Sequence, residues 1–184
     1  MNYHLKVAGL ERELPLCKVA DDFYIAAFIM FGDVEITVNS ARELLKKAPE
    51  FDVLITAESK GIPLLYEMAK QAGKNYYIVA RKGAKLYMRD VITTKVDSIT
   101  TDHQQVLCIG ADEAQAMKGK RVLIVDDVIS TGESLAALET LIHQVGGNIV
   151  GRMAVLAEGD AISRTDITYL APLPVFHADG SEIK

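Results

Sequence analysis

The fold of this chain is decided by the stretch Val122-Leu123-Ile124-Val125-Asp126-Asp127-Val128-Ile129-Ser130-Thr131-Gly132-Glu133-Ser134. Apolar residues typical of a buried strand lead into two adjacent carboxylates, and a short Ser-Thr-Gly turn then opens a helix. Ligands bind α/β sheets in the crevice at the carboxyl ends of parallel strands. Backbone N–H groups at the start of the helix, together with its dipole, are suited to hold a phosphate group. The two upstream carboxylates can accept hydrogen bonds from the hydroxyl groups of a sugar. The stretch therefore predicts a site for a phosphorylated sugar.

Two other phosphate-binding motifs are missing from the sequence. It contains neither G-x-x-x-x-G-K-[ST] nor G-x-G-x-x-G, which argues against a P-loop and against a Rossmann dinucleotide site. A purely structural alternative is a strand that ends in a capped helix, with Asp127 and Ser130 as turn and cap residues. Adjacent aspartates at a buried edge are costly without a ligand, so we favour the binding site.

Short β-rich runs alternate with helical periodicity from residue 53 onward. The predicted strands are residues 53–57, 75–80, 121–126 and 148–157, and the predicted helices are residues 61–72 and 133–145. This alternation predicts an α/β fold with a parallel sheet that is covered by helices on both faces.

Two regions depart from this alternation. Residues 1–38 look like short extended segments and turns, punctuated by Pro15 and Gly32-Asp33, and a helix is predicted from Asn39 to Ala48. Residues 83–105 are polar and rich in threonine, without a strong helix signal. A long irregular segment inside an α/β domain is more often a functional loop or a hairpin flap than a linker.

The central stretch resembles the signature with which type I phosphoribosyltransferases bind 5-phosphoribosyl-1-pyrophosphate (PRPP), and the similarity extends over residues 38–176. The segment Val79-Ala80-Arg81-Lys82-Gly83-Ala84-Lys85-Leu86 resembles the adenine and xanthine enzymes of this family. The resemblance implies a type I phosphoribosyltransferase-like parallel sheet flanked by helices, with a flexible loop and a small hood. We expect one domain overall, in which residues 1–38 contribute to the hood or edge and residues 39–184 form the core. The family also implies a homodimer.

The resemblance assigns a group of PRPP to each motif. It places the ribose hydroxyls near Asp126 and Asp127, and Mg²⁺ is expected to arrive mainly through PRPP, without a metal site of the protein's own. The remaining assignments are Ser130, Thr131, Gly132, Glu133 and Ser134 for the 5′-phosphate, Ser59, Lys60, Gly61, Arg81, Lys82 and Lys85 for the pyrophosphate, and Val128, Ile129 and Phe176 for the base. For Phe176, plain core packing is an equal alternative. For Ser59, the alternative is the N-cap of the helix that follows.

The flexible loop of adenine phosphoribosyltransferases carries a Glu-Tyr pair that the corresponding residues 98–104 lack. The loop is closer to the threonine-rich loop of the xanthine enzymes. Asp102 or His103 is a candidate acid or base there, although a solvated loop residue is the commoner case. The resemblance as a whole nevertheless implies adenine as the favoured acceptor base and xanthine as the next.

Composition excludes several other classes of protein. Of the 184 residues, 49% are hydrophobic, and the formal net charge is −5, which disfavours nucleic-acid binding. The longest apolar stretch, Phe23 to Phe31, is too short to span a membrane. Cys17 and Cys108 show no metal or redox spacing. The start of the sequence lacks the apolar region of a signal peptide, so we expect a cytoplasmic protein. The family resemblance implies PRPP and a purine base as its partners.

Two alternatives to a transferase stay open. A PRPP-sensing regulator of the same fold would keep the phosphate site without the transfer chemistry. An unrelated α/β phosphate-binding module is the other alternative, and the combination of Asp126-Asp127, Ser59-Lys60-Gly61 and Arg81-Lys82 counts against it.

Overall fold

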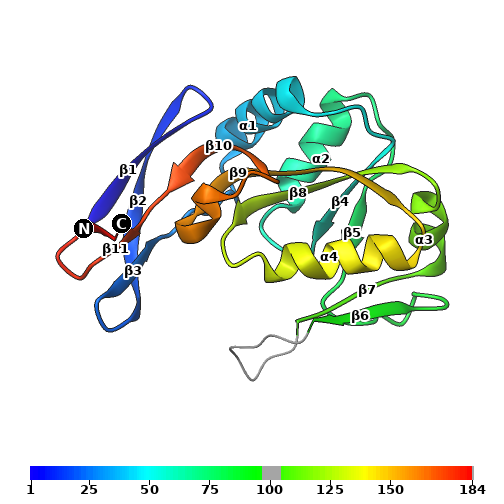
Figure 1. Ribbon diagram of the computed structural model, residues 1–184. Helices are drawn as coiled ribbons and strands as arrows, with labels where there is room; N and C mark the ends of the chain where they lie inside the picture. Colours follow the sequence, from blue (N-terminus) through cyan, green and yellow to red (C-terminus); the bar gives the residue numbers. More distant parts are fainter. Residues whose placement is uncertain (97–104, 184) are drawn as a thin grey trace.

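The computed structural model of the chain describes residues 1–96 and 105–183 (Figure 1). Its centre is a five-stranded sheet in the order β10-β9-β8-β4-β5, in which every neighbouring pair is parallel. The bounds of these strands are Val53–Ala57 for β4, Ile78–Ala80 for β5, Arg121–Ile129 for β8, Asn148–Glu158 for β9 and Thr168–Leu173 for β10. The predicted parallel sheet is confirmed, although β5 is shorter than expected and β8 continues past the acid pair.

Helices cover both faces of this sheet. Their bounds are Val34–Lys47 for α1, Ile62–Gln71 for α2, Ala111–Met117 for α3 and Glu133–Gln144 for α4, and a 3₁₀ helix, η1, spans Gly159–Ser163. Neighbouring strand residues point to opposite faces. Leu54 and Leu123 accordingly pack with α1 and α2 in one core, whereas Ile55 and Ile124 pack with α4 in the other.

Helix α1 begins five residues before the predicted start at Asn39, so that prediction is wrong. The carboxylate of Asp33 caps the helix by accepting a hydrogen bond of 3.0 Å from the backbone N–H of Ile36. Asp33 also pairs with Arg12 at 2.7 Å. An aspartate after a glycine is typical of a turn, but it is equally typical of a helix N-cap. The short helix α3 was not predicted at all.

Both ends of the described chain meet in a second sheet, which we call the hood sheet (Figure 1). It is antiparallel throughout and has the order β1-β2-β3-β11-β12. Its strands are Asn2–Val7 (β1), Leu10–Ala20 (β2), Phe23–Ala26 (β3), Val175–Phe176 (β11) and Glu182–Ile183 (β12). Buried side chains of this sheet, such as Leu5 and Leu14, join the core beneath α1 and α2. The hood sheet thus packs on the body of the molecule as part of a shared core.

The threonine-rich region contains a hairpin of β6 (Ile92–Val96) and β7 (Gln105–Ile109), with Ile92 opposite Ile109. This pairing agrees with the hairpin flap, one of the two arrangements expected for this region. The hairpin joins the body through backbone bonds between Cys108 and Arg81. Within the part of the chain that the structure describes, no helix combines the length and apolar character that crossing a bilayer requires.

Candidate functional site

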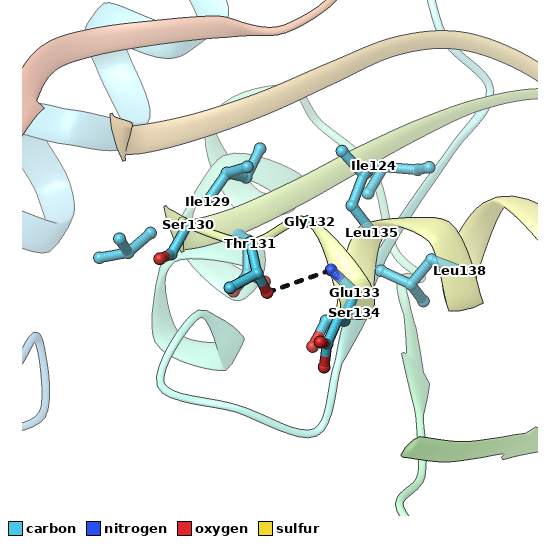
Figure 2. A pocket seen from close by; sticks show the side chains of 11 residues that line it. Ile124, Ile129, Ser130, Thr131, Gly132, Glu133, Ser134, Leu135 and Leu138 are labelled. Carbon is cyan, nitrogen blue, oxygen red and sulfur yellow. Dashed lines mark hydrogen bonds between the residues drawn. The ribbon is translucent and has the colours of Figure 1, made fainter. Parts of the chain in front are cut away.

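A cavity of about 120 Å³ lies where β8 ends and α4 begins (Figure 2). Gly132, the N-cap of α4, has a φ of 82°, a left-handed conformation that glycine adopts without strain. The hydroxyl of Thr131 lies 3.5 Å from the backbone nitrogen of Glu133. The cavity is lined by Ile124, Asp126, Val128, Ile129, Ser130, Thr131, Gly132, Glu133, Ser134, Leu135 and Leu138. It therefore brings together all five residues predicted for the 5′-phosphate at a helix N-terminus, where anions bind.

The two acidic residues next to the cavity differ in their partners. Asp126 Oδ1 accepts hydrogen bonds from the hydroxyl of Ser59 at 3.1 Å and from the backbone N–H of Asp127 at 2.9 Å. Burial, together with the neighbouring charge of Asp127, raises the pKa of the Asp126 carboxyl well above its usual range. Asp127 is 3% exposed, and its buried Oδ2 atom has no hydrogen bond. A sugar hydroxyl is the kind of donor that would satisfy such an acceptor.

The loop after β4 reaches the acid pair directly. Lys60 Nζ lies 3.3 Å from Asp127 Oδ2, and the hydroxyl of Ser59 accepts a bond of 3.2 Å from the backbone N–H of Gly61. A Cβ atom on Gly61 would stand 3.0 Å from Asp126 Oδ1, so only glycine fits without displacement. The N-cap of α2 is Gly61, which corrects the alternative that gave this position to Ser59. The hydroxyl of Ser59 instead connects its own loop to Asp126.

A group of cationic residues lies beside the same loop. Arg81 is 3.5 Å from Glu58, and the backbone N–H of Lys82 donates a bond of 3.0 Å to Glu58. This bond, together with the nearby charges of Arg81 and Lys85, lowers the pKa of Glu58. The buried Nε of Arg81 has no hydrogen-bond partner within the described residues. The predicted pyrophosphate residues thus lie next to one another, and Glu58 is a connecting residue that sequence reasoning did not single out.

The residues predicted to contact the base have different surroundings. Val128 and Ile129 line the cavity at the end of β8. Phe176 is 3% exposed, and its ring packs on Tyr3 with the centroids 5.3 Å apart. This is the packing of a core side chain. We therefore assign Phe176 to the core and not to stacking on the base. Asp102 lies outside the described residues, and so does His103.

A second hollow, the hood cleft, lies between the hood sheet and the edge of the parallel sheet. It has a volume of about 480 Å³ and is lined by Val19, Phe23, Ile25, Ser130, Thr131, Glu158, Gly159, Asp160, Val175 and Ile183. Glu158 is the last residue of β9, and the hydroxyl of Ser130 lies close enough to its carboxyl to influence the pKa. Sequence reasoning missed Glu158. An acidic residue directly after a buried strand is nevertheless the signal that identified Asp126.

Comparisons with known proteins agree with this geometry. The family model described as "Phosphoribosyl transferase domain" matches residues 35–171. The chain is 35% identical to adenine phosphoribosyltransferase of Cenarchaeum symbiosum over 114 residues, which is 61% of this chain and 64% of that protein. It is 34% identical to the enzyme of the same name from Natranaerobius thermophilus over 117 residues, 64% of each chain. The matches therefore span less than two thirds of these relatives.

Solved structures show the same fold. Adenine phosphoribosyltransferase from Saccharomyces cerevisiae, complexed with an imino-altritol bisphosphate and adenine, aligns with a TM-score of 0.68 at 20% identity, covering 86% of this chain and 92% of the other. The enzyme from Thermoanaerobacter pseudethanolicus aligns with a TM-score of 0.65 at 22% identity, covering 78% and 84%. The layered sheet, the phosphate cavity and the loop beside the acid pair thus occur in a fold that these proteins share.

Proposed function

The chain belongs to the phosphoribosyl transferase family, and we propose that it is an enzyme that transfers the 5-phosphoribosyl group of PRPP to a purine base. The products would be a nucleoside monophosphate and pyrophosphate. The observation that carries this proposal is the contact between the loop after β4 and the acid pair in β8. Ser59 donates a hydrogen bond of 3.1 Å to Asp126, and Lys60 forms an ion pair of 3.3 Å with Asp127, directly beside the helix N-terminus that forms the phosphate cavity.

Each group of PRPP has a complementary set of residues in this arrangement. The 5′-phosphate fits the cavity formed by residues 130–134. The ribose hydroxyls would donate to the acid pair, where Asp127 Oδ2 is buried without a hydrogen bond. The pyrophosphate would lie among Lys60, Arg81 and Lys82, which are cationic.

The reaction breaks the bond between C1 of the ribose and a pyrophosphate oxygen and forms a bond from C1 to a purine nitrogen, whose proton is released to the departing pyrophosphate or to water. Negative charge grows on the departing pyrophosphate, and Lys60, Arg81 and Lys82 are positioned to stabilise it. Positive charge grows on the ribose, next to the side chains of the acid pair, Asp126 and Asp127. Residues 130–134 hold the phosphate end of the substrate, so that C1 is oriented for attack from the opposite face.

Mg²⁺ fits this site as an ion held mainly by the substrate. Within residues 1–96 and 105–183, no cluster of three or more His, Cys, Asp or Glu side chains is arranged to hold a metal. Phosphate oxygens and one or two carboxylates are the usual surroundings of Mg²⁺ in such sites. Bound in this way, the ion would neutralise part of the pyrophosphate charge, and Asp126 or Asp127 would be its nearest protein ligand.

We favour adenine as the acceptor, with xanthine next. The two curated relatives described above carry the name of the adenine enzyme, and the structure from Saccharomyces cerevisiae contains adenine. The corresponding role is purine salvage by a cytoplasmic homodimer. In this proposal residues 39–184 form the core, and residues 1–38 contribute the hood strands.

The alternative is a PRPP-sensing regulator that binds the ligand without turnover. It rests on the same phosphate cavity, together with the missing Glu-Tyr pair in residues 98–104. One assay separates the two functions. Purified protein is incubated with PRPP and Mg²⁺ and with adenine, hypoxanthine, guanine or xanthine, and the nucleotide is measured by chromatography. Nucleotide formed from any base supports the transferase. PRPP binding without product from any base would support the sensor instead.

A further inference from the structure

The hood cleft is a second compartment that opens beside the phosphate cavity. Ser130 and Thr131 line both hollows, so the two lie side by side at the end of β8. The cleft's volume of about 480 Å³ lies within the range of small-molecule sites, roughly 300 to 1,000 Å³. Phe23, Ile25, Val175 and Ile183 of the hood sheet give it apolar walls, which suit the faces of a flat aromatic ring.

Glu158 brings a carboxylate to this apolar compartment. Its position at the carboxyl end of β9 is fixed by parallel pairing on both sides of that strand. Its side chain lines the hood cleft together with Ser130, and the charge of Lys60 is close enough to act on its carboxyl. Burial raises the pKa of its carboxyl, because surrounding atoms exclude water from the charge. Ser130 donates a single hydrogen, and a carboxylate can accept several.

We propose that Glu158 is a specificity-determining residue that selects amino-substituted purines by accepting a hydrogen bond from the exocyclic amino group. This inference rests on the transferase function proposed above. A carboxylate is an acceptor without donors when ionised, so an N–H group of the base matches it, whereas a carbonyl oxygen would oppose it. Hydrogen bonds to charged groups are the stronger class, and a buried acceptor that loses its partner is penalised further.

The test compares adenine with unsubstituted purine, which lacks only the amino group, in the parent protein and in Glu158→Ala. We expect kcat/KM in the parent protein to favour adenine over purine by about 10- to 100-fold, the range for one charge-assisted hydrogen bond. In Glu158→Ala this ratio should fall to within about threefold of unity. A ratio that stays at the parent value in Glu158→Ala overturns the proposal, and so does a parent protein without any preference.

Two further variants separate selection from a structural role. Glu158→Gln keeps the shape and one acceptor oxygen, so it should retain part of the preference, and it replaces the alanine variant if that protein does not fold. Glu50→Gln changes an exposed carboxylate outside the cleft, where it pairs with Arg121, and should leave the adenine-to-purine ratio unchanged. If Glu158 only supports Ser130, its variants will raise the KM for PRPP equally with both bases and leave the ratio alone, which overturns the proposal.

An equilibrium measurement makes the result independent of turnover. Binding of adenine and of purine is measured by calorimetry with ribose 5-phosphate present, because no transfer occurs in that mixture. If the parent protein transfers to no base but binds adenine more tightly, and Glu158→Ala loses that preference, the transferase function fails and the selection by Glu158 stands. If the parent protein transfers and the ratio is unchanged in both assays, the transferase function stands and the selection by Glu158 fails.

Discussion

The ammonium group of Lys60 lies 3.3 Å from Asp127 Oδ2 and also donates a hydrogen bond of 3.2 Å to the carbonyl oxygen of Phe28. This one side chain connects the loop after β4, the end of β8 and the segment that leads from the hood sheet to α1. The Lys60 side chain is 42% exposed, whereas that of Asp127 is 5% exposed. Lys60 can therefore turn toward an anion in solution, while Asp127 is held in place.

Replacing Lys60 by methionine should weaken PRPP binding by about 10- to 100-fold, because a charge-assisted contact to the pyrophosphate is lost. The unfolding free energy should fall by about 1 kcal/mol, a small value because half of the pair is open to solvent. Calorimetry with PRPP and urea denaturation give the two quantities. Lys46→Met removes an exposed lysine that pairs with Glu43 and should change neither. Unchanged PRPP affinity in Lys60→Met would remove Lys60 from the site.

Gly61→Ala tests the close approach of the pyrophosphate loop to the acid pair. The new Cβ would stand 3.0 Å from Asp126 Oδ1 and 3.1 Å from the backbone nitrogen of Asp127. Such crowding costs about 1–3 kcal/mol of stability and should displace both carboxylates, so that PRPP binding falls with it. Gly83→Ala is the matched control, since nothing lies within 4 Å of its Cβ position. Equal behaviour of the two variants would contradict this tight packing.

Gly132→Ala, compared with Gly32→Ala, distinguishes the effect of a left-handed backbone on stability from the effect of the phosphate cavity on PRPP binding. Gly132 and Gly32 have nearly the same left-handed φ, 82° and 84°. Alanine should therefore destabilise either position by about 1–2 kcal/mol. Only Gly132 also faces a neighbour, Arg164 Nη1, at 2.6 Å from the new Cβ. We expect thermal unfolding to shift in both variants, but PRPP affinity to fall in Gly132→Ala alone.

Asp126→Asn should make the ligand-free protein more stable at neutral pH while reducing transfer. The folded state raises the pKa of Asp126, so at pH values above the usual aspartate range it holds a proton that the unfolded chain releases. The contribution of Asp126 to the unfolding free energy therefore falls as the pH rises from the usual aspartate pKa to the raised pKa of the folded state. Asparagine removes this dependence and still accepts from Ser59. Denaturation between pH 5 and 8 checks the sign, and a variant with a steeper decline than the parent protein would refute it.

Much of the fold could be predicted where a local run of apolar residues is also buried in the structure. The apolar run from Val122 to Val125, followed by Asp126, predicted both a central strand and the edge where the site lies. The start of α1 could not be predicted, because an aspartate after a glycine fits a turn as well as a helix N-cap, and the additional contact of Asp33 with Arg12 joins distant parts of the sequence. Glu158 was missed for a related reason. Its meaning depends on the hood strands from the two ends of the sequence, which no local pattern brings together.

The hood sheet also determines the order in which the protein can assemble. Strand β3 (residues 23–26) pairs with β11 (residues 175–176), so this part of the hood sheet can form only after β11 has been synthesised. On a ribosome, the strands and helices around the phosphate cavity emerge before β11 and β12. Domains commonly acquire structure during synthesis, and pairing between distant segments is slow. A nascent chain would therefore form its phosphate cavity first, and the wall of the hood cleft would be the last part to close.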